Sequence, residues 1–309
     1  MSSNLSGEPL RRPEYVREYA TPAAFRAAVE ATLRERARRL KVPAYIGRRQ
    51  AALERLMVRL MKVAPNRWAL KGGMAIESRL GERARASLDL DADHVKGAEA
   101  ARADLQRAAI EDVGDHFTFA ITGSEELREA GVGLAIRYKL ESALAGRQFE
   151  PLQVDVSINA PDPWDAQPAQ RPGLLTRLGL DPIDVLLVPL ERQVAEKLHA
   201  YTRTYKGGGT TRGRDLVDLL LILKHERVDE TLLKSVIRRV FDRRATHAVP
   251  ERLPAPPPEL AVSYRREAEP VGVASSIEEA HEVLRAWLDP VLAQVARTDA
   301  DNKATNPDD

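Results

Sequence analysis

Apolar side chains recur every three or four residues near the start of the chain, which is the spacing of one helix face. Thr21-Pro22 is a favourable helix start, because a threonine hydroxyl can cap the first turn and proline suits the first helical position. One face of this helix carries Phe25, Val29 and Leu33. A second helix follows the same spacing through Leu53, Leu56, Met57, Leu60 and Met61. We therefore expect residues 1–66 to form N-terminal helices that pack on the core.

From residue 67 the pattern is typical of short strands. Trp68-Ala69-Leu70 predicts a strand that runs into Lys71-Gly72-Gly73 and a short helix. Residues 87–93 alternate strictly, which predicts another strand. One face carries Leu88, Leu90 and Ala92, and the other carries Ser87, Asp89, Asp91 and Asp93. Further strands are predicted at 117–122, 132–140, 152–158 and 185–188, with a helix at 97–113. Residues 67–188 should therefore form a sheet core.

The second half of the chain favours helices, which makes the predicted fold class α+β. Helical periodicity runs from Pro189 to about Arg244, so we assign 189–245 to a helical half. Residues 246–274 hold too many prolines for regular structure. We expect 246–297 to form a proline-rich linker and a C-terminal helix that Pro290 kinks, and 298–309 to form a disordered polar tail.

Composition limits the classes of protein and site. The 309 residues are 43% hydrophobic and 30% charged, as in soluble globular proteins. The absence of cysteine excludes disulfides, thiolate metal sites and cysteine nucleophiles. No apolar run is long enough to span a membrane, and charged residues occupy the N-terminus where a signal peptide would be apolar. We expect a cytoplasmic protein.

Charge is distributed unevenly along the chain despite a net charge of +1. Residues 1–67 hold 15 Lys or Arg against 6 Asp or Glu, and residues 191–247 hold 13 against 8. Two such segments can form a surface for a polyanion. Arginine-rich helices are equally consistent with solvated faces, and charge alone favours that interpretation.

The strongest chemical signal is the pair Asp89 and Asp91. Residues i and i+2 of a strand project from one face, so these carboxylates should lie side by side. Their repulsion is relieved by a cation, and magnesium prefers such oxygen ligands together with substrate phosphates. In a two-metal site one ion activates the attacking hydroxyl and the other stabilises the leaving pyrophosphate. Such a pair is common by composition alone, and it indicates a magnesium-dependent nucleotidyltransferase only together with the glycine turn that precedes it.

A Gly72-Gly73 turn before a helix supports this interpretation. Backbone N–H groups of such a turn can approach phosphate oxygens, helped by the helix N-terminus. Lys71, Arg83 and Arg85 flank the turn and could neutralise a triphosphate. The alternative is a plain strand, turn and helix followed by a solvated acidic strand.

Three downstream features remain open between functional and structural roles. Asp155 is either a third metal ligand on a neighbouring strand or an exposed strand residue. Lys197 borders an apolar helix face, so it either extends to water or faces a phosphate or a carboxylate inside a cleft. Asp215 and Asp218 lie one turn apart on a largely apolar helix, where a carboxylate needs a partner. They either form ion pairs, favour the helix dipole, or face the nucleotide with Lys197.

Five stretches, taken together, resemble the AbiEii/AbiGii (MenT-type) toxin nucleotidyltransferases of bacterial toxin–antitoxin systems. They are Lys71-Gly72-Gly73, residues 85–91, Val154-Asp155-Val156, Glu196-Lys197-Leu198 and residues 214–219. The resemblance implies a polymerase-beta-like nucleotidyltransferase core, a mixed sheet with flanking helices, followed by a helical half that completes the active site. It also implies a toxin that adds nucleotides, pyrimidines in the better-understood members, to the 3′ end of tRNA. Such addition blocks aminoacylation and translation.

The resemblance also implies roles for particular residues. The expected catalytic residues are Asp89, Asp91, Lys197 and Asp215. The expected nucleotide-binding residues are Lys71, Gly72, Gly73, Arg85 and Ser87. The expected ligands of a two-ion magnesium site are Asp89, Asp91 and Asp155. The implied partners are a nucleoside triphosphate, the tRNA acceptor end and a cognate antitoxin, which in one branch is a kinase acting on the serine that matches Ser87.

Two departures from the family pattern leave other functions open. Gly73 stands where many nucleotidyltransferases have serine, and nothing familiar matches residues 246–297. One alternative is a catalytically silent protein that binds RNA or a partner. Another is a nucleotidyltransferase that modifies a protein or a small molecule. The intact acid pair argues against the first, and the basic N-terminal segment favours a nucleic acid over the second.

Overall fold

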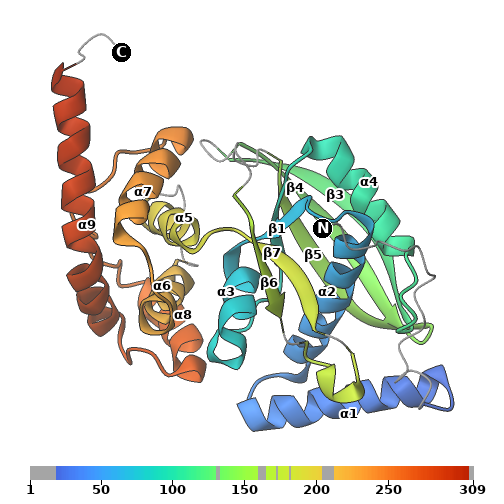
Figure 1. Ribbon diagram of the computed structural model, residues 1–309. Coiled ribbons are helices and arrows are strands. Elements are labelled where there is room, and N and C mark those ends of the chain that lie inside the picture. The colour runs from blue at the N-terminus through green and yellow to red at the C-terminus, as the bar shows by residue number, and fades with distance from the viewer. Residues whose placement is uncertain are drawn as a thin grey trace, which may run out of the picture.

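The computed structural model describes residues 19–129, 133–158, 165–171, 173–180, 182–203 and 212–305. Figure 1 shows a sheet with N-terminal helices on one side of the molecule and a group of C-terminal helices on the other. This arrangement confirms the predicted α+β class, a mixed sheet with flanking helices. The expectations for residues 1–18 and 306–309 lie outside the described residues, as does the part of the predicted sheet core at 159–164.

The two predicted N-terminal helices are confirmed. Helix α1 (Pro22–Leu40) begins after Thr21, whose side-chain oxygen accepts a hydrogen bond from the Ala24 N–H at 3.1 Å. Helix α2 (Ala44–Val63) packs against the sheet, and α1 runs across the end of this layer (Figure 1). The apolar faces of both helices are buried in the core that also holds the sheet residues. Hydrophobic periodicity therefore identified this layer correctly.

Seven strands form one mixed sheet in the order β3-β4-β5-β2-β1-β7-β6. They are β1 (Trp68–Leu70), β2 (Leu90–His94), β3 (Phe117–Glu129), β4 (Gly133–Leu144), β5 (Arg147–Ser157), β6 (Gln167–Arg171) and β7 (Ile183–Leu187). The short elements between them are α3 (Gly72–Leu80), η2 (Gly81–Arg83), α4 (Gly97–Ile110) and η3 (Thr176–Leu178). Strand β2 runs parallel to β5, and their register places Asp91 opposite Asp155. The sheet thus brings two of the predicted carboxylates together near its centre.

Two strand predictions need correction. Strand β2 begins only at Leu90, so Ser87 lies in the preceding loop and not on the strand face with Asp91. Strand β6 was missed, because it contains Pro168 and lacks a clean apolar alternation. Proline is tolerated there since β6 is an edge strand with a neighbour on one side only.

The helical half has its own hydrophobic core. It consists of α5 (Leu190–Thr202), α6 (Gly213–His225), α7 (Glu230–Arg244), α8 (Leu260–Ala268), η4 (Glu269–Val271) and α9 (Ile277–Thr305). Helix α3 connects the two halves, since Met74 and Ala75 belong to the sheet core while Ile76 and Leu80 belong to the helical core. No helix in the described part of the chain combines the length and apolarity that a membrane span requires.

The segment 246–274 is more regular than expected. Helix α8 lies within it, and the prediction of irregular structure was wrong there because residues 260–268 contain no proline. Leu260, Tyr264 and Ala268 are buried at intervals of four residues, so α8 packs one face onto the helical core. Helix α9 contains Pro290 and continues through Thr305, further than the tail predicted from residue 298 would allow.

Candidate active site

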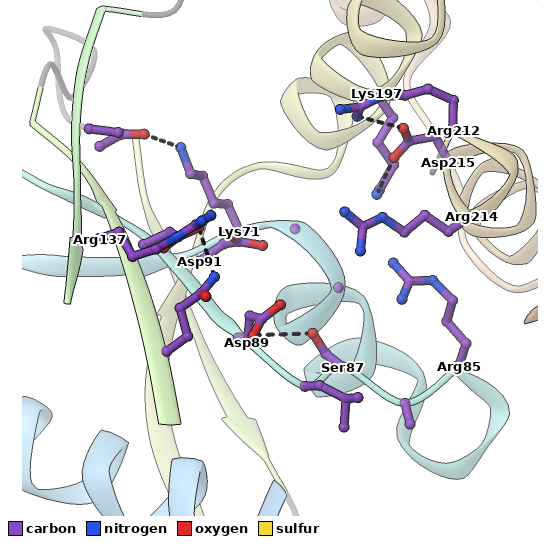
Figure 2. A pocket seen from close by; sticks show the side chains of 18 of the residues that line it. Lys71, Arg85, Ser87, Asp89, Asp91, Arg137, Lys197, Arg212, Arg214 and Asp215 are labelled. Atoms are coloured by element: carbon purple, nitrogen blue, oxygen red, sulfur yellow. Dashed lines mark hydrogen bonds and ion pairs between the residues drawn. The ribbon is translucent and has the colours of Figure 1, made fainter. Parts of the chain in front are cut away.

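A cleft of about 840 Å³ lies where the sheet meets the helical half. All ten site residues named from the sequence line it: Lys71, Gly72, Gly73, Arg85, Ser87, Asp89, Asp91, Asp155, Lys197 and Asp215. They come from elements more than 100 residues apart in the chain, including α3, β2, β5, α5 and α6. In Figure 2, Asp89 and Asp91 lie on the sheet side and face Arg85, Arg214 and Lys197 across the cavity.

The sheet side of the cleft is a cluster of carboxylates with perturbed pKa values. Burial, with the charges of Asp155 and Asp89, raises the pKa of Asp91 to about 6 against the opposing effect of Lys71. Burial and the charge of Asp155 likewise raise the pKa of Asp89. Both shifts mean that, without a bound cation, the protein environment disfavours the ionised carboxylates. A bound cation would reverse this penalty, so the donors suit a divalent metal.

Asp155 already has a partner in this structure. The Arg137 guanidinium donates to both of its oxygens, at 2.9 and 2.7 Å. Within the ranges the structure describes, no group of three or more acidic or histidine side chains is placed to hold a metal by itself. The donor set still fits magnesium, because that ion takes one or two carboxylates and completes its shell with phosphate oxygens and water. Asp89 and Asp91 are therefore the carboxylates best placed to act as metal ligands.

The two glycines of the turn are required by close packing against the site. Gly72 has φ +59°, and a Cβ there would lie 2.4 Å from Oδ2 of Asp91. A Cβ on Gly73 would lie 2.8 Å from Oγ of Ser87. Gln193 on α5 donates to the Gly72 carbonyl at 3.3 Å, which ties the turn to the helical half. Glycine thus lets the backbone approach the carboxylates directly.

Lys71 lines the cleft, but its ammonium already makes an ion pair. Its Nζ lies 3.0 Å from Asp93 and also donates to Ser157. Asp93 is shared with Arg192, so a buried ionic group supports this end of the cleft. Burial opposes protonation of Lys71, but Asp93 and Glu196 outweigh it, and its pKa lies above the ordinary value. Lys71 therefore enters the cleft as a fixed positive charge.

The helical side of the cleft is rich in cations organised by two aspartates. Lys197 donates to Asp218 at 2.5 Å and to Asp215 at 3.3 Å. Arg85 donates to both oxygens of Asp218, at 2.8 and 2.7 Å. Asp218 is fully buried, whereas Asp215 lines the cleft and also pairs with Arg212 at 3.0 Å. Asp218 is therefore the anchor of this wall, and Asp215 is the acid that reaches the cavity.

Ser87 sits against the carboxylates in the loop before β2. Its hydroxyl donates to the backbone carbonyl of Asp89 at 3.2 Å, and its N–H donates to Glu77 at 3.1 Å. Glu77 is held in turn by Arg171 of the edge strand at 2.7 Å. A buried polar network thus fixes the loop that carries Asp89. Arg83, which the sequence grouped with the cationic loop, is not among the lining residues and donates instead to the Leu80 carbonyl.

Several lining residues were missed in the sequence. Arg214 is exposed in the cleft, and it lowers the pKa of both Asp89 and Asp91, although burial dominates each shift. Arg137 and Gln153 contact Asp155 from the neighbouring strand positions. Arg266 and Glu267 come from α8. Arg214 had a usable signal, since it directly precedes Asp215, whereas α8 had none because its segment appeared irregular.

Comparison with known proteins agrees with this geometry. A family model described as the nucleotidyl transferase AbiEii toxin of type IV toxin–antitoxin systems matches residues 55–290. The fold is similar to that of MenT4, a nucleotidyltransferase toxin of Mycobacterium tuberculosis H37Rv, with a TM-score of 0.53 and 20% identity. That match covers 87% of this chain and 98% of MenT4.

A candidate nucleotidyltransferase from H. pylori aligns with a TM-score of 0.42 and 18% identity, over 81% of this chain and 96% of its own. No curated protein matches the sequence.

Proposed function

The chain belongs to the AbiEii family of nucleotidyl transferase toxins, and on that premise we propose that it transfers a nucleotide from a nucleoside triphosphate to the 3′ end of tRNA. Transfer there would block aminoacylation and so halt translation. The proposal includes magnesium as the metal and a pyrimidine nucleotide as donor, both on the family resemblance. A cognate antitoxin would restrain the activity.

The observation that carries the proposal is the opposition of charge across one cleft. Asp89 and Asp91 stand on the sheet side, and Arg85, Arg214 and Lys197 face them across the cavity (Figure 2). A triphosphate complexed to a divalent ion has the matching distribution, because its ion seeks carboxylates and its phosphate oxygens seek cations. The cleft volume of about 840 Å³ accommodates such a ligand.

Asp89 and Asp91 would hold the metal, with Asp155 as a further ligand once Arg137 gives up its carboxylate. When bound, the ion supplies charge neutralisation and lowers the pKa of an attacking hydroxyl. Lys197, Arg85 and Arg214 would bind the triphosphate oxygens and stabilise the charge that develops on pyrophosphate. Arg85 and Lys197 are fixed by Asp218 and Asp215 before substrate arrives, which limits their reorganisation during the reaction.

The chemical balance of the transfer is simple. The 3′ oxygen of the acceptor forms a new bond to the α-phosphorus, and the bond between α-phosphorus and the bridging oxygen breaks. Pyrophosphate leaves with the bonding electrons, and the hydroxyl proton passes to solvent. The residues that orient the two oxygens therefore matter more than any covalent nucleophile of the protein.

Regulation at Ser87 forms part of the proposal. A phosphate at this position would add a charge of roughly −1.5 to −2 beside Asp89 and Asp91. Ser87 is only 6% exposed, so a kinase would need the loop before β2 to open. The antitoxin would then act on a conformation in which the site is already disassembled.

The test is direct. Purified protein is incubated with magnesium and each radiolabelled nucleoside triphosphate, with total RNA, total protein or small-molecule acceptors in parallel. We expect label on tRNA, released by removal of the 3′-terminal nucleotide. Asp184→Ala serves as the control, because this exposed acid on β7 lies outside the cleft. Label on protein or a small molecule would reject tRNA as the acceptor while retaining the enzyme class.

A further inference from the structure

Helix α8 delivers two charged side chains to the cleft from a segment whose prolines had predicted irregular structure. Arg266 and Glu267 line the cavity at the C-terminal end of this helix. The opposite face of α8 is fixed, because Tyr264 is fully buried and its hydroxyl donates to the Ala274 carbonyl at 2.7 Å. The position of these charges is therefore set by packing.

Gly213 makes this arrangement possible. A Cβ at this first residue of α6 would lie 2.8 Å from the Tyr264 nitrogen and 3.0 Å from its Cα. The backbone of α8 therefore touches the start of the helix that carries Arg214 and Asp215. Two cleft-lining segments are locked together at one glycine, so α8 is part of the site and not a peripheral addition.

Arg214 and Arg266 occupy different depths of the cleft. Arg214 lies within electrostatic reach of Asp89 and Asp91, so it acts near the metal and the triphosphate. The Arg266 side chain is 77% exposed although it lines the same cavity, which places it at the entrance. Its partner is Glu267 on the same helix at 3.2 Å, a contact in solvent that a phosphate can readily replace.

A nucleoside triphosphate bound at the carboxylates would occupy the floor of the cleft, whereas a polymeric acceptor must extend out through the entrance. We infer that Arg266 binds a backbone phosphate of the acceptor RNA. It thereby positions the 3′ end, and Arg214 serves the triphosphate. This inference rests on the proposed function. Arg266 is accordingly a specificity-determining residue that favours a polyanionic acceptor over a neutral one.

The test uses a fluorescein-labelled tRNA transcript and fluorescence anisotropy over a range of salt concentrations, without nucleotide. Arg266→Ala should weaken binding several-fold and reduce the slope of log K against log salt by about 0.7 to 0.9, the value for one lost phosphate contact. Arg266→Lys should retain most of the slope. Arg265→Ala is the matched control, because Arg265 is an exposed neighbour on α8 that does not line the cleft.

The same variants are titrated with a non-hydrolysable nucleoside triphosphate and magnesium. Nucleotide affinity should be unchanged in Arg266→Ala, and the acceptor KM for transfer should rise with little change in kcat. If Arg265→Ala and Arg266→Ala lose the same tRNA affinity, the effect comes from the overall charge of α8 and not from a contact of Arg266. That result would overturn the inference. If the unmutated protein labels tRNA but Arg266→Ala leaves the salt slope unchanged, the inference about Arg266 is overturned and the proposed function stands. If the unmutated protein labels only protein acceptors, the inference and the proposed tRNA acceptor are both overturned.

Discussion

Asp218 accepts two hydrogen bonds from the guanidinium of Arg85, a residue 133 positions earlier in the chain. This pair joins the loop before β2 to α6, so it connects the metal side of the cleft to the helical half. Asp218 also accepts from Lys197 and is fully buried. Burial opposes ionisation of Asp218, but Arg85 and Lys197 outweigh it, and its pKa lies below the ordinary value. The carboxylate is therefore an anchor that aligns two cations.

The two acids of α6 should differ when each is replaced. Asp218→Asn leaves Arg85 and Lys197 buried beside a neutral amide, so we expect a loss of about 3–5 kcal/mol in unfolding free energy and of transfer. Asp215→Asn should abolish most transfer while costing less than about 1.5 kcal/mol, because Lys197 keeps its bond to Asp218 and the Arg212 side chain is partly exposed. Urea unfolding together with tRNA labelling checks both. Equal destabilisation by the two variants would contradict the division of roles.

Removal of a metal-binding carboxylate should separate activity from stability. We expect Asp89→Ala and Asp91→Ala each to abolish transfer, because the loss of one ligand costs several kcal/mol, roughly a thousandfold or more in rate. Unfolding free energy should hold or rise, since burial and the charge of Asp155 raise the pKa of both carboxyls. Transfer assays and thermal melts test this expectation, with Asp184→Ala as the control variant. Near-normal transfer by either variant would reject the assignment.

Much of the site could be predicted because its residues follow local rules. The spacing of Asp89 and Asp91 predicted that both lie at one site, and the family resemblance added Lys197 and Asp215, which line the same cleft. The predictions that failed concern features that depend on contacts with residues distant in sequence. No local pattern distinguishes Asp215 from Asp218, because the difference is which of them meets Arg85. Strand β6 and helix α8 were hidden, since edge position and docking onto α6 stabilise segments whose sequences lack clear periodicity.

Two glycines with nearly the same positive φ provide a comparison. Gly72 and Gly81 have φ values of +59° and +61°, but a Cβ meets Asp91 at the first and nothing within 4 Å at the second. Gly81→Ala should cost about 1–3 kcal/mol of conformational strain, because the ψ of −131° lies outside the left-handed region that other residues visit, and it should leave transfer intact. Gly72→Ala should add a displacement of Asp91 and lose at least a hundredfold in kcat. If both variants keep normal transfer, the close approach at Gly72 has no role in the site.

A buried histidine should make the helical half sensitive to acid. Burial, with Arg244 and His247 nearby, lowers the pKa of His199 to about 3, from an ordinary value of 6.5. The folded state therefore resists protonation, so stability is complete above pH 6.5 and is lost as pH falls toward 3. Between pH 7 and 5 this loss should be about 2 kcal/mol of unfolding free energy. Urea unfolding of the parent and of His199→Gln checks it, and an equal pH dependence in both would contradict the assignment.

The last prediction concerns Ser87, whose hydroxyl donates to the Asp89 carbonyl beside the carboxylates. Ser87→Ala loses only this hydrogen bond, so it should retain much of the transfer activity. Ser87→Glu adds a negative charge where the pKa of Asp89 and Asp91 is already raised, and it should suppress transfer strongly.

The size of the glutamate side chain is a competing explanation, because the Ser87 Oγ lies only 2.8 Å from where a Cβ on Gly73 would be. Ser87→Gln separates the two, since it has the shape of glutamate without the charge. Transfer measured at saturating magnesium and nucleotide should rank Ala above Gln and Gln above Glu. Equal loss in the Gln and Glu variants would show that crowding inactivates the loop, and the case for an inhibitory charge at this position would then fail.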